Sequence, residues 1–182
     1  MEMTLEEQLY TFQRDGLWTG DVRPEAIEAL DVPEPYRGLL EHERDMTGTL
    51  EEFWGARLTL HPLEVHHVGD LLLRRVVLLA DERPVEYGAI RIHLDAFTPE
   101  AREKIEAGQT PLGAILRTTD MPYRCQPRGY FRVEADPVTR QGLSLGSQGD
   151  IVLYGRLAHL TGPEGRTLAQ VVEILPPAEP RT

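Results

Sequence analysis

Two charged residues, Arg74 and Glu173, interrupt stretches of sequence that otherwise look like apolar strands. Arg74 is followed by Arg75, and neighbouring residues of a strand point to opposite faces. One of the two arginines must therefore face the core, where a guanidinium is costly unless it is paired and where its planar fork suits a carboxylate. A ligand carboxylate and a structural salt bridge explain this pattern equally well.

Glu173 lies within the run Val171 to Leu175. On an antiparallel sheet we expect it to lie near Arg74. A buried glutamate beside an arginine and a ligand could transfer a proton or accept a hydrogen bond. Alternatively, Glu173 is only the ion-pair partner of a core arginine, and the sequence leaves both interpretations open.

Backbone amides offer a second way to hold an anion. The segment 110–113, Thr-Pro-Leu-Gly, predicts a helix start, where amide groups point outward and attract negative charge. The turn at 46–48, Met-Thr-Gly, could do the same, although most such amides bind only water. With Arg74 and Glu173, the turn before Leu112 predicts one buried pocket for a small anionic ligand.

The sequence offers little for metal or thiol chemistry. His61, His66 and His67 match no established ligand spacing, and no cluster of carboxylates or cysteines completes a coordination set. The single cysteine, Cys125, excludes an internal disulfide and has no obvious base beside it. We expect no metal and no cofactor.

Composition narrows the class of partner. A net charge of −11 over 182 residues argues against nucleic acid and against an anionic membrane surface. No stretch has the length of a membrane span or the form of a signal peptide, so the expected location is the cytoplasm. We expect a monomer made of a single domain over 1–182, with a helical segment over 1–35 and a frayed tail over 176–182.

The elements that would position these residues alternate between hairpins and helices. Helices are expected at 5–14, 25–30, 39–45, a short stretch after Thr49, 98–108 and 112–116. A break is expected at 46–48. Strands are expected at 57–68 (interrupted at Pro62), 71–80, 85–94, 130–134, 151–160 and 167–175. Sequential hairpins with helices between them predict an α+β fold, an antiparallel β-sheet flanked by helices.

Several short motifs occur in the order found in a known enzyme family. They are Leu39-Leu40 leading to Asp45-Met46-Thr47, Leu73-Arg74 with 76–81, Gly108 to Gly113, and Glu173-Ile174-Leu175-Pro176-Pro177. Over roughly 36–177 the chain resembles the chorismate lyase (chorismate pyruvate-lyase) family. One departure is that Gly48, Thr49 and Leu50 follow Met-Thr, where better-known bacterial members have basic residues.

The resemblance implies a chorismate lyase-like fold with the ligand sealed beneath flaps. It implies a cofactor-independent carbon–oxygen lyase that eliminates pyruvate from chorismate to give 4-hydroxybenzoate for ubiquinone biosynthesis. It also implies that Arg74 and the amides of Met46 and Leu112 hold ligand oxygens, while Glu173 engages the ring hydroxyl and assists proton movement. The implied partner is a small aromatic or cyclohexadienyl carboxylate.

Two alternatives stay open. The effector domains of some bacterial regulators, of the UTRA type, share this fold and bind small molecules without turnover. They usually follow a DNA-binding winged helix, and the first 50 residues here are acidic and too short to supply one. The other alternative is a related enzyme that converts chorismate into another product, such as 3-hydroxybenzoate.

Overall fold

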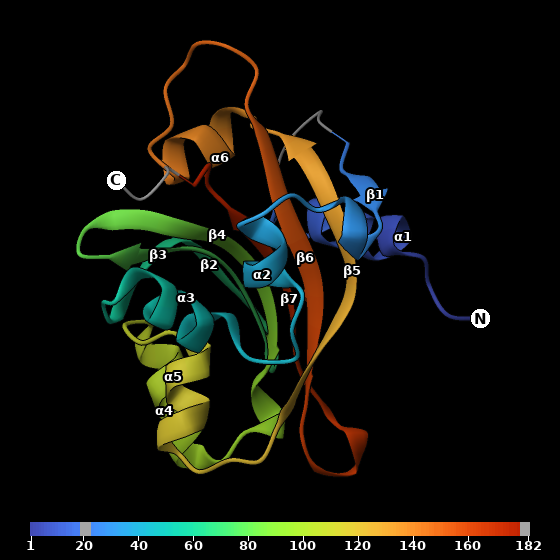
Figure 1. Ribbon diagram of the computed structural model, residues 1–182. Helices are drawn as coiled ribbons and strands as arrows, with labels where there is room; N and C mark the ends of the chain where they lie inside the picture. The colour runs from blue at the N-terminus through green and yellow to red at the C-terminus, as the bar shows by residue number, and fades with distance from the viewer. Residues whose placement is uncertain (19–22, 179–182) are drawn as a thin grey trace.

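The computed structural model describes residues 1–18 and 23–178. The described residues form a seven-stranded antiparallel sheet in the order β1-β5-β6-β7-β4-β3-β2 (Figure 1). The strands are β1 (Glu25–Ile27), β2 (Leu58–Val68), β3 (Leu71–Ala80), β4 (Arg83–His93), β5 (Arg124–Glu134), β6 (Val152–Thr161) and β7 (Thr167–Leu175). The α-helices are α1 (Leu5–Arg14), α2 (Tyr36–Leu40), α3 (Met46–Trp54), α4 (Pro99–Ala107), α5 (Leu112–Thr118) and α6 (Pro137–Gly142).

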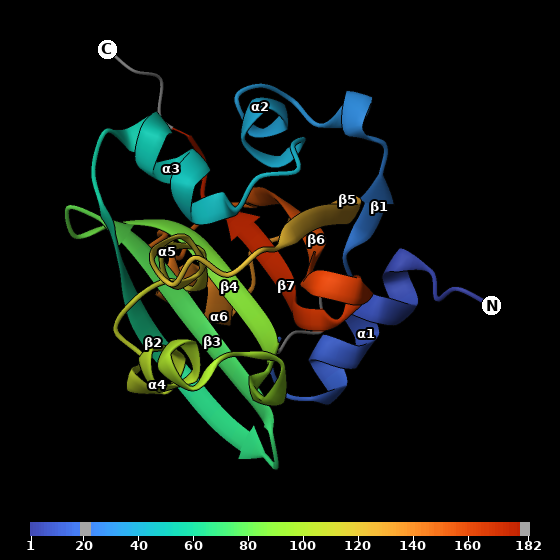
Figure 2. The same cartoon turned by 90° about the horizontal axis from the view of Figure 1, so that it is seen from below.

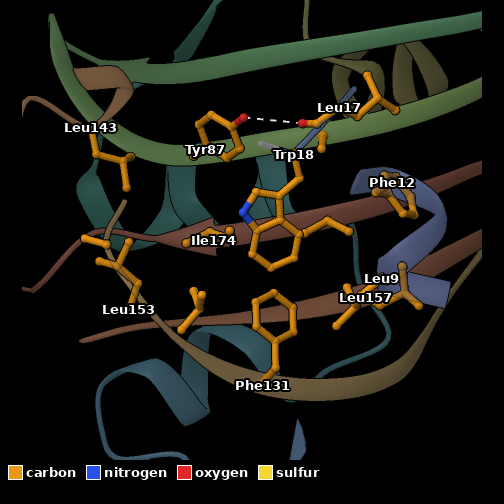
Figure 3. Close-up of a cluster of buried hydrophobic side chains, with 14 of the residues drawn as sticks. Leu9, Phe12, Leu17, Trp18, Tyr87, Phe131, Leu143, Leu153, Leu157 and Ile174 are labelled. Carbon is orange, nitrogen blue, oxygen red and sulfur yellow. Dashed lines mark hydrogen bonds between the residues drawn. The ribbon is translucent and has the colours of Figure 1, made fainter. Parts of the chain in front are cut away.

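Hydrophobic side chains of the sheet are divided between its two faces by the two-residue period of the strands. One face packs against α1 and α6, and its core includes Phe12, Trp18, Tyr87 and Phe131. Trp18 and Phe131 lie with ring centroids 5.5 Å apart, and the Tyr87 hydroxyl donates to the carbonyl of Leu17 at 3.4 Å (Figure 3). We call this the α1 face.

The opposite face is covered by α2, α3, α4 and α5 (Figure 2). Its apolar residues form two clusters, one under α4 and α5 and the other under α2 and α3. Four buried charged residues lie on the strands of this same face: Arg74, Glu86, Arg156 and Glu173. We call it the pocket face, because these charges surround the cavity described below.

The expected α+β fold on an antiparallel sheet is confirmed, and several local signals are too. Thr4 and Glu7 form the capping box that starts α1. Thr98 caps α4, which has proline at its first position and ends at Gly108. The irregularity expected at Pro62 is a register shift in β2, and β2 is an edge strand of the sheet.

Some expected local elements of the fold are wrong. The helix expected at 25–30 is the strand β1, which pairs with 130–132 of β5, followed by a 3-10 turn at Ala29–Asp31. Pairing with a sheet edge outweighs the local helix signal there. As a result, the segment 1–35 is only partly helical. Residues 179–182 of the tail lie outside the described residues, while the amide of Ala178 donates to the Tyr36 hydroxyl at 2.7 Å.

The break expected at 46–48 is instead the first turn of α3. Asp45 caps this helix, accepting a hydrogen bond from the amide of Gly48 at 2.8 Å. The short helix expected at 39–45 lies earlier, at Tyr36–Leu40. The helix α6 was not expected, although Asp136 followed by Pro137 repeats the cap-and-proline signal that marks α4.

Candidate functional site

A cavity of about 60 Å³ lies between the pocket face of the sheet and the first turns of α3 and α5. Its floor is made by residues of the strands: Leu60, Arg74, Val76, Leu78, Glu86, Gly88, Ile90, Cys125, Leu160, Val171 and Glu173. Its cover is made by Asp45, Met46, Thr47, Pro111, Leu112 and Gly113. The four residues expected to form a site, Arg74, Glu173, Met46 and Leu112, therefore line one cavity.

Arg74 faces this cavity from the middle of β3 and is 2% exposed. Its Nη1 donates to the carbonyl of Ile105 at 3.3 Å, and its Nε has no hydrogen-bond partner. Burial lowers the pKa of Arg74 to about 10. Arg75 points to the other face and pairs with Glu64, as expected for neighbours in a strand.

Glu173 is not the partner of Arg74, which corrects our expectation. It lies opposite Arg156 in the β6–β7 ladder, and Arg156 Nε donates to its Oε2 at 2.5 Å. Arg74 lies on β3, with β4 between it and β7. Burial raises the pKa of Glu173, and the attraction of Arg156 opposes this rise.

Arg156 is fully buried and was not expected as a site residue. Its other nitrogens donate to three backbone carbonyls: those of Leu40 (3.1 Å), His42 (2.9 Å) and Arg44 (3.1 Å). These carbonyls belong to the segment that leads into α3, so Arg156 ties the cover to the sheet. A signal was present, because Arg156 interrupts an apolar strand just as Arg74 does.

Glu86 is the second site residue that the sequence interpretation missed. It is 4% exposed, lines the cavity from β4, and its Oε2 has no hydrogen-bond partner. Burial raises the pKa of Glu86 well above its usual range, and the charges of Glu173 and Asp45 add to the rise, while Arg156 opposes it. Burial in such a place favours the protonated form of a carboxyl.

The cover is packed closely through Asp45. Its carboxylate accepts from the amide of Gly48 and from the Tyr123 hydroxyl, the latter at 3.0 Å. A Cβ at Gly113 would lie 2.4 Å from Asp45 Oδ1, so the two helix starts meet without room for a side chain. Met46 and Leu112 are the first residues of α3 and α5, whose amides have no acceptor within their own helices.

The size of the cavity limits what can enter without movement. A volume of about 60 Å³ holds roughly four to six water molecules, at about 10–15 Å³ each. A ligand with an aromatic ring is larger than this. Such a ligand would therefore bind only if the starts of α3 and α5 move away from the sheet.

His61, His66 and His67, the residues considered for metal binding, all lie on β2. His66 contacts Glu64 on the exposed part of β2, with Nε2 and Oε1 2.5 Å apart. Within 1–18 and 23–178, no group of three histidine, cysteine or acidic side chains is placed to hold a metal ion. Burial raises the pKa of Cys125 to about 12, which keeps this thiol protonated at neutral pH.

No protein-family model and no curated protein matches the chain. Solved structures do. The ligand-binding domain of a GntR-family transcriptional regulator from Bordetella bronchiseptica aligns with a TM-score of 0.51 and 14% identity, over 66% of this chain and 83% of that one. The effector domain of PhnF from Mycobacterium smegmatis aligns with a TM-score of 0.52 and 13% identity, over 72% and 88%.

The longer PhnF structure from Mycobacterium smegmatis aligns with a TM-score of 0.52 and 14% identity, over 72% of this chain. The alignment spans 63% of that PhnF chain. At these identities the likeness establishes the fold. The chain has the chorismate lyase-like fold in the form found in ligand-binding domains of GntR-family regulators.

The prediction of a carbon–oxygen lyase is wrong. The similar structures are ligand-binding and effector domains of transcriptional regulators. The specific expectations of chorismate turnover, 4-hydroxybenzoate and ubiquinone biosynthesis fall with it.

The sequence also led to expectations about location and about nucleic-acid binding. No helix among the described residues is long and apolar enough to cross a membrane. The absence of a nucleic-acid partner stays a prediction.

Proposed function

We propose that this protein is a non-catalytic ligand-binding domain that holds a small organic anion in the cavity between α3, α5 and the sheet. Arg74 would contact the anionic group, and the amides of Met46 and Leu112 would hold its oxygens from the cover. Glu173, with Arg156, would form the opposite side of the site. The ligand-binding domains with the same fold support a sensing role of this kind.

The observation that carries the proposal is that the buried guanidinium of Arg74 has no ionic partner among the described residues. Among the described residues, no carboxylate lies within ion-pair distance of its guanidinium. Its Nη1 donates to the carbonyl of Ile105 at 3.3 Å, and its Nε is buried without an acceptor. A buried charge without a partner costs several kcal/mol. A ligand carboxylate in the cavity would supply that partner in bidentate geometry.

Arg74 also has a structural role that must be separated from binding. The carbonyl of Ile105 is near the carboxyl end of α4, where a positive charge is favourable by about 0.3–1 kcal/mol. If this were the whole role of Arg74, its replacement would lower stability and leave ligand binding unchanged. A binding role changes both quantities.

The test compares an acid with its uncharged counterpart. Thermal unfolding is followed with benzoate and with benzamide, for the wild type and for Arg74→Met. A ligand at about 100 times its Kd adds about 2.7 kcal/mol, which for a chain of this size raises Tm by about 5–10 °C. We expect this rise only for benzoate and only in the wild type.

Arg75→Met is the matched control, because Arg75 is adjacent on β3 but points to the α1 face. It should keep the response to benzoate. An equal response of Arg74→Met and the wild type would contradict the proposal. Release of pyruvate from chorismate by the purified wild type would contradict its non-catalytic part.

A further inference from the structure

The cavity has groups of opposite character at its two ends. The β3–β4 register pairs Arg74 with Ile90 and Leu78 with Glu86. Arg74 and Glu86 are therefore four residues apart along neighbouring strands, about 13 Å at the rise of a strand. Gly88 lies between them on the same face and lines the cavity without a side chain.

At the end of the cavity formed by Glu86, this carboxyl has no cation of its own among the described residues. Glu173 has Arg156, and Asp45 has the amide of Gly48 and the Tyr123 hydroxyl. Among the described residues Glu86 forms no ion pair, and its Oε2 is buried without a hydrogen-bond partner.

Arg156 cannot serve a ligand as well. Its Nε is bound to Glu173, and Nη1 and Nη2 donate to the carbonyls of the segment before α3 and, at 3.7 Å, to Cys125 Sγ. A cation that could ionise Glu86 must therefore come from a ligand in the cavity. An ammonium group provides a positive charge and hydrogen-bond donors, whereas a hydroxyl donates and accepts hydrogen bonds but carries no charge.

We propose that the ligand is a zwitterion, with a carboxylate held by Arg74 and an amino group held by Glu86, separated by an apolar body. This deepens the proposed function and rests on it. Apolar side chains line the cavity between the two ends, among them Val76, Leu78 and Ile90. An α-amino acid carries its two charges on neighbouring carbons and cannot reach both ends.

The test uses three benzoates that differ only at the para position. They are 4-(aminomethyl)benzoate, 4-(hydroxymethyl)benzoate and 4-methylbenzoate. We expect the first to bind the wild type about 10-fold or more tighter than the other two, the size of one charged hydrogen bond. Isothermal titration calorimetry measures all three affinities.

Glu86→Gln removes the charge and keeps the shape of the side chain. This variant should fold, since the wild-type carboxyl has no partner to lose. Its preference for the aminomethyl compound should fall to about 3-fold or less. Glu134→Gln, at an exposed position of β5, is the control and should keep the wild-type preference.

A proton count gives a second readout. Glu86 faces Glu173 on β7, Arg156 on β6 and Asp45 before α3, with Arg74 on β3 at the far end. Because burial favours the protonated form of Glu86 in the empty cavity, an ammonium group that pairs with its carboxylate should displace a proton. Calorimetry in two buffers of different ionisation enthalpy should show proton release for the aminomethyl compound only, and none for Glu86→Gln.

The possible failures are distinguishable. Equal affinity for all three benzoates, with all three lost in Arg74→Met, would overturn the zwitterion and leave the proposed anion site standing. Binding that persists in Arg74→Met would contradict the proposed function itself. Failure of all three compounds to bind the wild type would contradict both.

Discussion

Arg156 and Glu173 face each other across β6 and β7, with Arg156 Nε donating to Glu173 Oε2 at 2.5 Å. Both side chains are buried. The pair supplies a cation for Glu173, the acidic residue that we had expected to lie near Arg74. It thereby separates the buried charges of the pocket face into one neutral pair and two residues, Arg74 and Glu86, that face the cavity without an ionic partner among the described residues.

Breaking this pair should destabilise the fold strongly. Arg156→Met leaves Glu173 buried without a cation and frees the carbonyls of the segment before α3. We expect a loss of about 3–5 kcal/mol in the free energy of unfolding, measured in urea. Adding Glu173→Leu should recover part of this loss, since no charge is then left unpaired.

An exposed pair provides the comparison. Arg132 and Glu25 form an ion pair with exposed side chains on β5 and β1. Arg132→Met should cost less than about 1 kcal/mol. If Arg156→Met cost no more than Arg132→Met, the buried pair would not support the cover as we describe.

Glu86 should make stability depend on pH. Its pKa is raised by burial in the folded protein, so between its unfolded pKa of about 4.3 and its folded pKa the folded state holds one more proton than the unfolded state. The free energy of unfolding therefore falls as pH rises through this range, by up to about 1.4 kcal/mol per pH unit.

Glu86→Gln removes this proton. Urea unfolding at several pH values between 5 and 8 should show the variant gaining stability relative to the wild type as pH rises. The carboxylates of Glu173 and Asp45 and the guanidinium of Arg156 remain in both proteins, so their contribution largely cancels. Parallel pH profiles for the two proteins would show that Glu86 does not hold the extra proton.

Much of the sheet could be predicted from the sequence because its strands carry long apolar runs. Charges inside those runs identified Arg74 and Glu173, and the same reasoning applied to every strand would have added Glu86 and Arg156. Helix starts with a cap and proline were predicted at Thr98 and overlooked at Asp136.

The partner of Glu173 could not be predicted from local pattern. In the sheet order β6-β7-β4-β3, β7 lies beside β6, and β4 separates it from β3. Such an order between strands distant in sequence is decided by the whole fold. The strand β1 was missed for a similar reason, since three residues carry no periodicity and their conformation is fixed by pairing with β5.

Gly88 should control access to the cavity more than it controls stability. A Cβ there would lie 3.2 Å from Val76 Cγ2 and 3.3 Å from Glu86 Oε1, close contacts that small shifts of two side chains relieve. Alanine in a strand is favoured over glycine by roughly 0.5–1 kcal/mol, which offsets that crowding.

We therefore expect Gly88→Ala to unfold within about 1 kcal/mol of the wild type and to bind benzoate about 10-fold more weakly or worse. Urea unfolding and calorimetry on the same preparation measure the two quantities. Full affinity in this variant would place the ligand away from the cavity floor.

Gly113 should instead control the packing of the cover. A Cβ there would lie 2.4 Å from Asp45 Oδ1 and 3.0 Å from Thr47 Oγ1, so α5 must move away from α3 or Asp45 must release the start of α3. Replacement of glycine by alanine within a helix otherwise stabilises by about 1 kcal/mol. Overpacking costs about 1–3 kcal/mol, and here the neighbour is a capping carboxylate held at 2.8 Å by the amide of Gly48.

The crowding should outweigh the helix preference, so we expect Gly113→Ala to lower the free energy of unfolding by about 1–2 kcal/mol. Gly146→Ala is the matched control, since a Cβ at Gly146 meets nothing within 4 Å, and it should be neutral or slightly stabilising. Urea unfolding of the two variants and the wild type shows whether Gly113→Ala lowers or raises the free energy of unfolding. A Gly113→Ala protein as stable as Gly146→Ala would mean that the starts of α3 and α5 separate at little cost, and that the cavity opens more easily than their contact through Asp45 implies.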